Sequence, residues 1–68
     1  GNIDINEAST GQLQNFNGVG PATAQKIIDY RSTNGPFSSC DELIKVNGIG
    51  NATLQKIKPD CKVTPLEQ

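Results

Sequence analysis

Two short segments of this sequence carry residue types suited to holding an anion. In each, two glycines flank one apolar residue, and an alanine, a threonine and a lysine follow at equal offsets: Gly18, Val19, Gly20, Ala22, Thr23 and Lys26, and then Gly48, Ile49, Gly50, Ala52, Thr53 and Lys56. Glycine lets a ligand approach the backbone closely. A helix that begins after each segment offers free amides and the positive end of its dipole. The pattern predicts one phosphate site per segment.

The alternative is that each Gly-x-Gly is a plain tight turn between helices. A single copy favours this alternative, whereas two copies with Thr and Lys at the same offsets favour a ligand. Duplicated packing without a ligand stays open for the matched pair. The dinucleotide-binding pattern is a weaker interpretation, because a third glycine and a preceding strand are not visible.

The two segments belong to a repeat with a period of 30 residues. Residues 9–27 and 39–57 are identical at ten of nineteen positions, and three further positions are apolar in both copies. Two copies are too few for a solenoid. They suit a domain with pseudo-two-fold symmetry, in which the two sites face antiparallel strands of a duplex.

Each copy reads as a helix, a tight hairpin and a second helix. Ser9 with Gln12, and Ser39 with Glu42, fit the capping box that begins a helix. Asn-Gly ends each first helix, and we expect Val19 and Ile49 to point into the core and hold the turn. The second helices end before residues 35–36 and at Pro59. We therefore predict an all-α, compact, pseudo-two-fold fold with four main helices and a connector.

The chain begins with Gly1 rather than Met, which indicates an excised or processed piece. We expect residues 1–2 to be a flanking remnant, residues 3–63 to form the domain, and residues 64–68 to form a flexible tail. Ile3, Ile5, Phe37 and Val63 are the apolar residues expected to close the ends of the core. No stretch resembles a signal peptide or a membrane span.

Charge and residue content limit the possible functions. The formal net charge is −1, which is unusual for a nucleic-acid-binding domain, although four of the six basic residues lie after residue 44. The chain has no His, no pattern of an activated nucleophile and no carboxylate cluster, so we expect no enzymatic activity, no metal site and no small-molecule substrate. A domain of this length has little room for both a core and a catalytic cleft.

Cys40 and Cys61 are the two cysteines of the chain. Cys40 lies at the start of the third helix and Cys61 just past the end of the fourth, and the tight hairpin folds these helices back on each other. This geometry predicts a disulfide, with two separate thiols as the alternative. An oxidised pair favours an extracytoplasmic location.

At these residues the sequence resembles the helix-hairpin-helix superfamily. The family pattern, apolar-x-x-apolar-x-Gly-apolar-Gly-x-x-x-apolar, matches residues 13–24 and 43–54. More narrowly, residues 3–6, 27–31 and 34–37 make the chain similar to the DNA-binding domains of ComEA-type competence receptors. The chain departs from many relatives, which carry Lys or Arg directly after the hairpin, so we expect modest affinity.

The resemblance implies binding of double-stranded DNA through phosphates, without reading the sequence, at the hairpin residues and helix starts given above. It implies a bacterial DNA-uptake receptor that is periplasmic or membrane-anchored facing outward, with channel or pilus components as further partners. We expect no cofactor, and a monovalent cation on the hairpin carbonyls, as in some relatives, stays open. A protein-interaction module on the same fold and an accessory domain of a repair enzyme are the alternatives.

Overall fold

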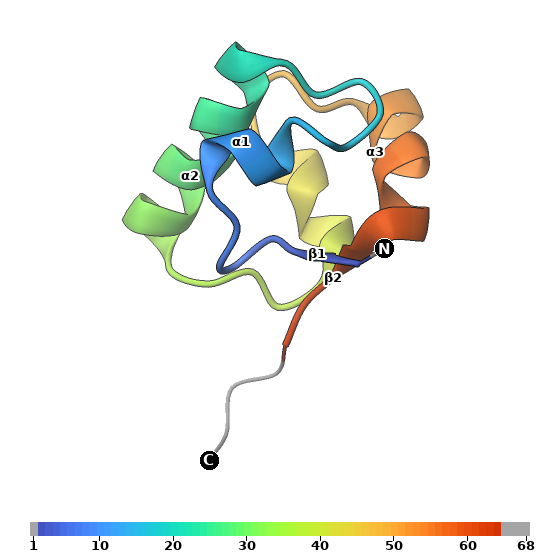
Figure 1. Cartoon of the computed structure of the whole chain (residues 1–68). Coiled ribbons are helices and arrows are strands. Elements are labelled where there is room, and N and C mark those ends of the chain that lie inside the picture. The colour runs from blue at the N-terminus through green and yellow to red at the C-terminus, as the bar shows by residue number, and fades with distance from the viewer. Residues whose placement is uncertain (1, 65–68) are drawn as a thin grey trace.

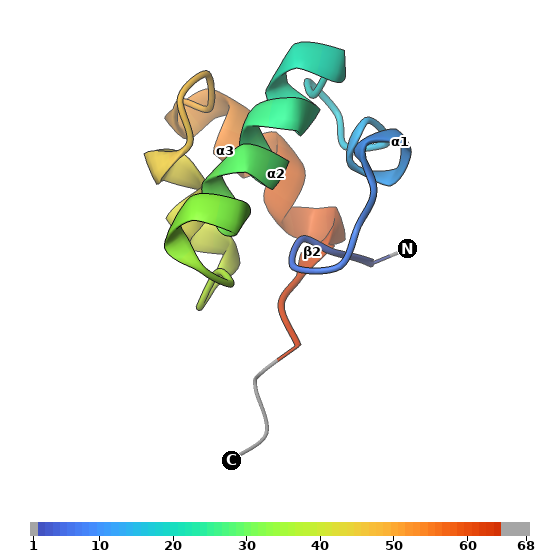
Figure 2. The same ribbon diagram turned by 90° about the vertical axis from the view of Figure 1, so that its left-hand side faces the viewer.

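The computed structural model describes residues 2–64, so Gly1 and residues 65–68 of the predicted flank and tail lie outside it. The elements are β1 (Ile3–Asp4), α1 (Thr10–Leu13), α2 (Pro21–Asn34), the 3-10 helix η1 (Cys40–Lys45), α3 (Asn51–Ile57), the 3-10 helix η2 (Lys58–Asp60) and β2 (Cys61–Lys62). The helices pack around one core, and the two hairpins lie together at the end opposite the short strands (Figures 1 and 2). The predominantly helical, two-repeat fold is as predicted.

The two repeats bury the same positions. From residue 13 to 27, and again from 43 to 57, the succession of buried, partly buried and exposed side chains is identical position by position. Burial recurs every third residue through the first helix and the hairpin, and in the second helix two positions three residues apart are buried, Ala24 with Ile27 and Leu54 with Ile57. Pseudo-two-fold symmetry therefore extends from the sequence to the packing.

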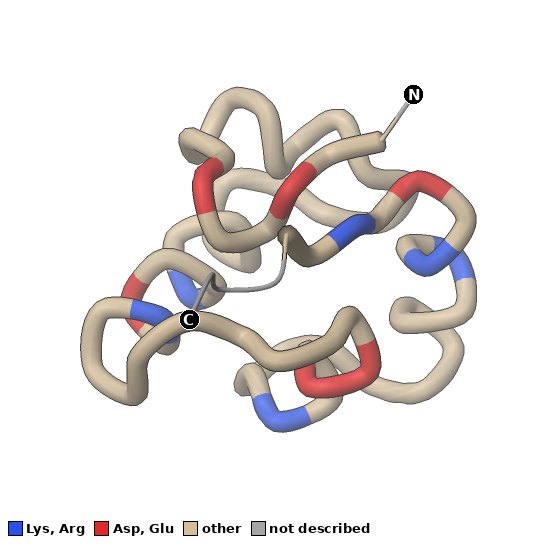
Figure 3. The backbone as a smooth tube through the Cα atoms, turned by 90° about the horizontal axis from the view of Figure 1, so that it is seen from below, with Lys and Arg blue, Asp and Glu red and all other residues tan. Residues whose placement is uncertain are grey.

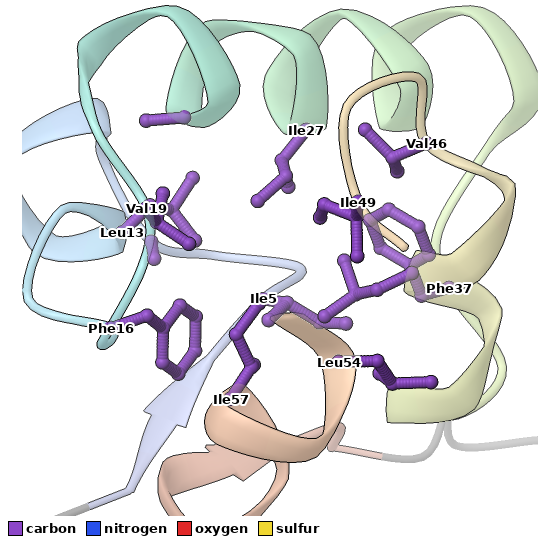
Figure 4. Close-up of a cluster of buried hydrophobic side chains, with 13 residues drawn as sticks. Ile5, Leu13, Phe16, Val19, Ile27, Phe37, Val46, Ile49, Leu54 and Ile57 are labelled. Atoms are coloured by element: carbon purple, nitrogen blue, oxygen red, sulfur yellow. The ribbon is translucent and has the colours of Figure 1, made fainter. Parts of the chain in front are cut away.

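The core is a single cluster of 13 buried hydrophobic residues (Figure 4). Its largest fully buried side chains are Phe16, Ile5, Leu13, Ile27, Leu43 and Ile57. Ile5 and Phe37 come from outside the repeats, and Ile3 and Val63 pack against the cluster from its edge. These four residues close the core as predicted.

Hydrogen bonds tie the N-terminal segment to the rest of the domain. The side-chain amide of Asn6 donates to the carbonyl of Phe37 (3.0 Å) and accepts from its amide (2.7 Å). The guanidinium of Arg31 donates to the carbonyl of Ile5 (2.8 Å). Because these bonds satisfy backbone groups beside buried residues, they hold the N-terminal segment in one position against the core.

The structure contains a short parallel ladder that the sequence did not predict. Ile3 pairs with Cys61 and Asp4 with Lys62. Beyond it, the hydroxyl of Thr64 donates to the carboxylate of Asp4 (2.6 Å), so the one described residue of the predicted tail is bonded to the domain.

The second capping box is a wrong prediction. Ser9 and Gln12 form the reciprocal box at α1, with bonds of 3.2 and 3.0 Å. At η1, the Ser39 side chain caps no amide, and the Glu42 carboxylate accepts from the amide of Ser38 instead. The amide of Glu42 bonds the carbonyl of Ser39 in the tighter 3-10 manner, so the cap residue lacks the geometry that an α-helical first turn provides.

Cys40 and Cys61 form a disulfide, as predicted. Their Cα atoms are 6.3 Å apart, within the range that a disulfide spans. The bond joins the start of η1 to β2, and Cys61 also packs against the core. The second repeat is thus covalently closed at its base.

Candidate nucleic-acid interface

The two hairpins are built alike. The amide of Val19 bonds the carbonyl of Phe16 (3.2 Å), and the amide of Ile49 bonds that of Val46 (3.0 Å). Gly18 and Gly48, at φ of 89° and 100°, occupy the left-handed region that side chains disfavour.

The central hairpin side chains are buried as predicted, since Val19 is 6% and Ile49 4% exposed. Any ligand would therefore meet these two residues through their backbone only.

The second glycine of each hairpin has no such conformational requirement. Gly20 and Gly50 have φ of −99° and −96°, which any residue adopts. A Cβ atom added to either would have no other part of the protein within 4 Å. Both are helix N-caps without a side-chain hydrogen bond, although Ser, Thr, Asp or Asn would stabilise the helix there. Both positions thus leave the backbone bare where the amides of a helix start face solvent.

The threonine and lysine that follow each hairpin lie next to the hairpin of the other repeat. A Cβ atom at Gly48 would lie 3.8 Å from Oγ1 of Thr23 and 3.8 Å from both Cδ and Nζ of Lys26. At Gly18 the neighbours are Cγ2 of Thr53 (3.7 Å) and Cδ of Lys56 (3.8 Å). From the sequence, we had predicted that each lysine acts with the hairpin of its own repeat.

Three basic residues have local anionic or carbonyl partners. Lys58 forms a 3.0 Å salt bridge with Asp41, and Arg31 bonds the carbonyl of Ile5. The hydrogen bond from Thr64, a backbone bond from Asn6 and, more weakly, the charge of Lys62 hold the pKa of Asp4 below its ordinary value. Seen from the end away from the hairpins, acidic and basic positions are interspersed (Figure 3).

The remaining cations are exposed. Among residues 2–64, Lys26, Lys45, Lys56 and Lys62 form no salt bridge. The hydrogen bond from the amide of Ser38 and, more weakly, the charge of Lys45 hold the pKa of Glu42 below its ordinary value. A shallow groove of about 340 Å³ runs from the second hairpin along α2 and is lined by Lys26, Asp29, Tyr30, Thr33, Asn34, Lys45 and Asn47. Sequence reasoning missed Lys45 as a candidate. Its position, two residues before the hairpin, was the available signal.

The other predicted contact residues, Ala22 and Ala52, are exposed in the first turns of α2 and α3. Within residues 2–64, no group of three or more His, Cys, Asp or Glu could hold a metal ion. No helix in the same range is long and apolar enough to cross a membrane.

Two hairpins, each placed between two helices, are the arrangement that defines the class of tandem helix-hairpin-helix domains. Residues 1–62 match the family described as the helix-hairpin-helix motif, and the chain belongs to that family. Its similarity to ComE operon protein 1 of Bacillus subtilis (strain 168) is 43% identity over 61 residues, which cover 90% of this chain and 30% of that protein. This match confirms the resemblance to competence proteins.

Animal proteins are also similar. The endonuclease/exonuclease/phosphatase family domain-containing protein 1 of Xenopus laevis is 38% identical over 56 residues, 82% of this chain and 10% of that protein. Its namesake in Danio rerio is 39% identical over 44 residues, 65% of this chain and 8% of that protein. The chain thus spans less than a third of the length of each of these relatives.

Proposed function

We propose that this domain binds double-stranded DNA by contacting backbone phosphates at its two hairpins, without preference for base sequence. The family supports a nucleic-acid ligand, and the similarity to ComE operon protein 1 supports a part in DNA uptake. Lys26 and Lys56 are exposed and lie beside Gly48 and Gly18, the first glycines of the hairpins, and the exposed Lys45 lines the groove next to the second hairpin. Such contacts hold a duplex in position without reading its bases.

The observation that carries this proposal is the pair Gly20 and Gly50. Neither backbone angle nor packing calls for glycine, and both positions forgo a helix-capping side chain. A ligand that must approach the backbone accounts for bare positions at equivalent places in both repeats.

A titration of unrelated duplexes over a range of salt concentrations tests the proposal. Three exposed lysines that neutralise phosphates give a log–log slope of about −3. Affinity should be similar for all duplexes. A flat salt response, or a strong preference for one sequence, would contradict the proposal.

Alanine substitutions at the second glycines separate binding from folding. Gly20→Ala and Gly50→Ala introduce a methyl group with no protein atom within 4 Å other than those of its chain neighbours, and affinity should fall about threefold to tenfold. Alanine is a poorer N-cap than glycine, so melting temperature should also fall, and binding is compared well below it. Gly11→Ala in α1 is the matched control, because its methyl group makes only an ordinary 3.9 Å contact with Ser9. If the two hairpin variants bind like the control, the hairpins are structural turns only.

The proposed setting is a bacterial DNA receptor outside the cytoplasmic membrane, periplasmic or anchored facing outward, that passes DNA to channel or pilus components. The disulfide supports this setting, because such bonds persist in oxidising compartments. Fractionation of cells that carry the parent protein, with thiol alkylation before lysis, tests it. A cytoplasmic protein with two free thiols would contradict it.

We further propose that the hairpin carbonyls can hold a monovalent cation. Those of Gly20 and Gly50 accept the amides of Ala24 and Leu54 at 2.9 Å, and each keeps a second lone pair. If a cation contributes, replacing potassium by a bulky organic cation at equal ionic strength should weaken binding. Equal affinity in both salts would remove the cation from the proposal.

A further inference from the structure

The residues proposed to contact phosphate are grouped in one way along the chain and in another way in the folded structure. Along the chain, Thr23 and Lys26 follow the first hairpin closely. In space, Thr23 and Lys26 flank Gly48 of the second hairpin, with the Lys26 ammonium 3.8 Å from where a Cβ of Gly48 would lie. No atom of either residue comes within 4 Å of the same position at Gly18.

The first hairpin shows the reciprocal arrangement. The methyl group of Thr53 and the Cδ of Lys56 are the atoms within 4 Å of a Cβ at Gly18. Lys56 therefore extends along the first hairpin, although it belongs to the second repeat. Two views at right angles place both hairpins at the same end of the domain (Figures 1 and 2). Each lysine therefore reaches the hairpin of the other repeat because the two repeats pack against each other.

The groove at the second hairpin supports this grouping independently. It is lined by Lys26 together with Asn47 and Lys45. Asp29 also lines it, but the amide of Gln25 donates to its carboxylate at 3.0 Å. Lys26 thus lies on the same surface groove as Lys45 and Asn47, which lie just before Gly48 of the second hairpin.

We propose, building on the DNA-binding function proposed above, that each phosphate site is assembled from both repeats. The backbone of the second hairpin acts with Thr23 and Lys26, and the backbone of the first acts with Thr53 and Lys56. A phosphate at the bare backbone of one hairpin lies beside the ammonium of the other repeat. Neither repeat alone then contains a complete site, and the lysines join the two halves when DNA is bound.

Double-mutant cycles on the intact domain test the assignment. They combine Lys26→Ala or Lys56→Ala with Gly20→Ala or Gly50→Ala, and a fixed duplex at low salt serves as the probe. Neighbouring groups couple, whereas distant groups add within about twofold in affinity. Lys26→Ala with Gly50→Ala should lose at least about threefold less affinity than the product of the single effects. Lys56→Ala with Gly20→Ala should do the same.

The pairs within one repeat serve as internal controls. Lys26→Ala with Gly20→Ala, and Lys56→Ala with Gly50→Ala, should match the product of the single effects within about twofold. Coupling within repeats, or no coupling anywhere, would overturn the assignment while leaving DNA binding intact. A parent domain that binds no duplex, or binds without salt dependence, would instead refute the function on which the assignment rests. Melting temperatures of all variants keep loss of folding apart from loss of binding.

Discussion

Removing the disulfide should destabilise this domain strongly. The bond joins Cys40 to Cys61 across a sequence separation of 21 residues. In the chain-entropy description, a loop of that size restricts the unfolded chain by about 3 kcal/mol at 25 °C. A domain of this size loses roughly 4–8 °C of melting temperature per kcal/mol, so a Cys40→Ser, Cys61→Ser double variant should melt roughly 12–24 °C lower.

The assay is thermal unfolding followed by circular dichroism, with the reduced parent domain as the control. The reduced parent and the double variant should agree, because both lack the same constraint. Below its melting temperature the variant should still bind DNA, since neither cysteine lies in a hairpin. A drop of less than about 4 °C would refute the entropic reasoning. Two freely alkylated thiols in the non-reduced protein would refute the bridge itself.

Three further results are expected. Arg31→Gln should lower the melting temperature without changing the salt slope of DNA binding, since Arg31 bonds the Ile5 carbonyl; Lys26→Ala, which removes the same charge from the same helix, should reduce the slope by about one. Lys45→Ala should also reduce the slope by about one, whereas an unchanged slope would remove the groove from the interface. The hydrogen bond from Thr64 lowers the pKa of Asp4, so the stability that Asp4 contributes is present above its ordinary value of 3.8 and is lost as pH falls through the lowered value. In urea titrations over a range of pH, Asp4→Asn should make the free energy of unfolding fall less steeply with decreasing pH. An equally steep fall in the variant would show that Asp4 does not contribute this stability.

Features encoded by local pattern were predictable from the sequence. The repeat predicted both hairpins, the buried Val19 and Ile49 and the ends of α2, because positive φ at glycine, proline at a helix start and apolar spacing act within a few residues. The disulfide followed from the sharp turn between η1 and α3. Apart from the disulfide, which joins residues 21 apart, these inferences needed only neighbours along the chain.

Features that depend on how distant segments pack were not predictable. The crossing of Lys26 and Lys56 to the opposite hairpins requires the relative position of the two repeats, which spacing along one repeat cannot supply. The pairing of Ile3 with Cys61 joins residues from opposite ends of the domain. The 3-10 form of η1 overrode a capping pattern that works at α1, because tertiary contacts decide among local geometries of similar energy.

The two-residue ladder of β1 and β2 determines how this domain would bear mechanical load. The strands are parallel, with Ile3 beside Cys61, and lie at the end away from both hairpins. Because the pair is parallel, the chain enters β1 and leaves β2 at opposite ends of the ladder. Opposing tension on the two flanks would shear the ladder along its length, and the Cys61 bond would carry part of that force directly into η1.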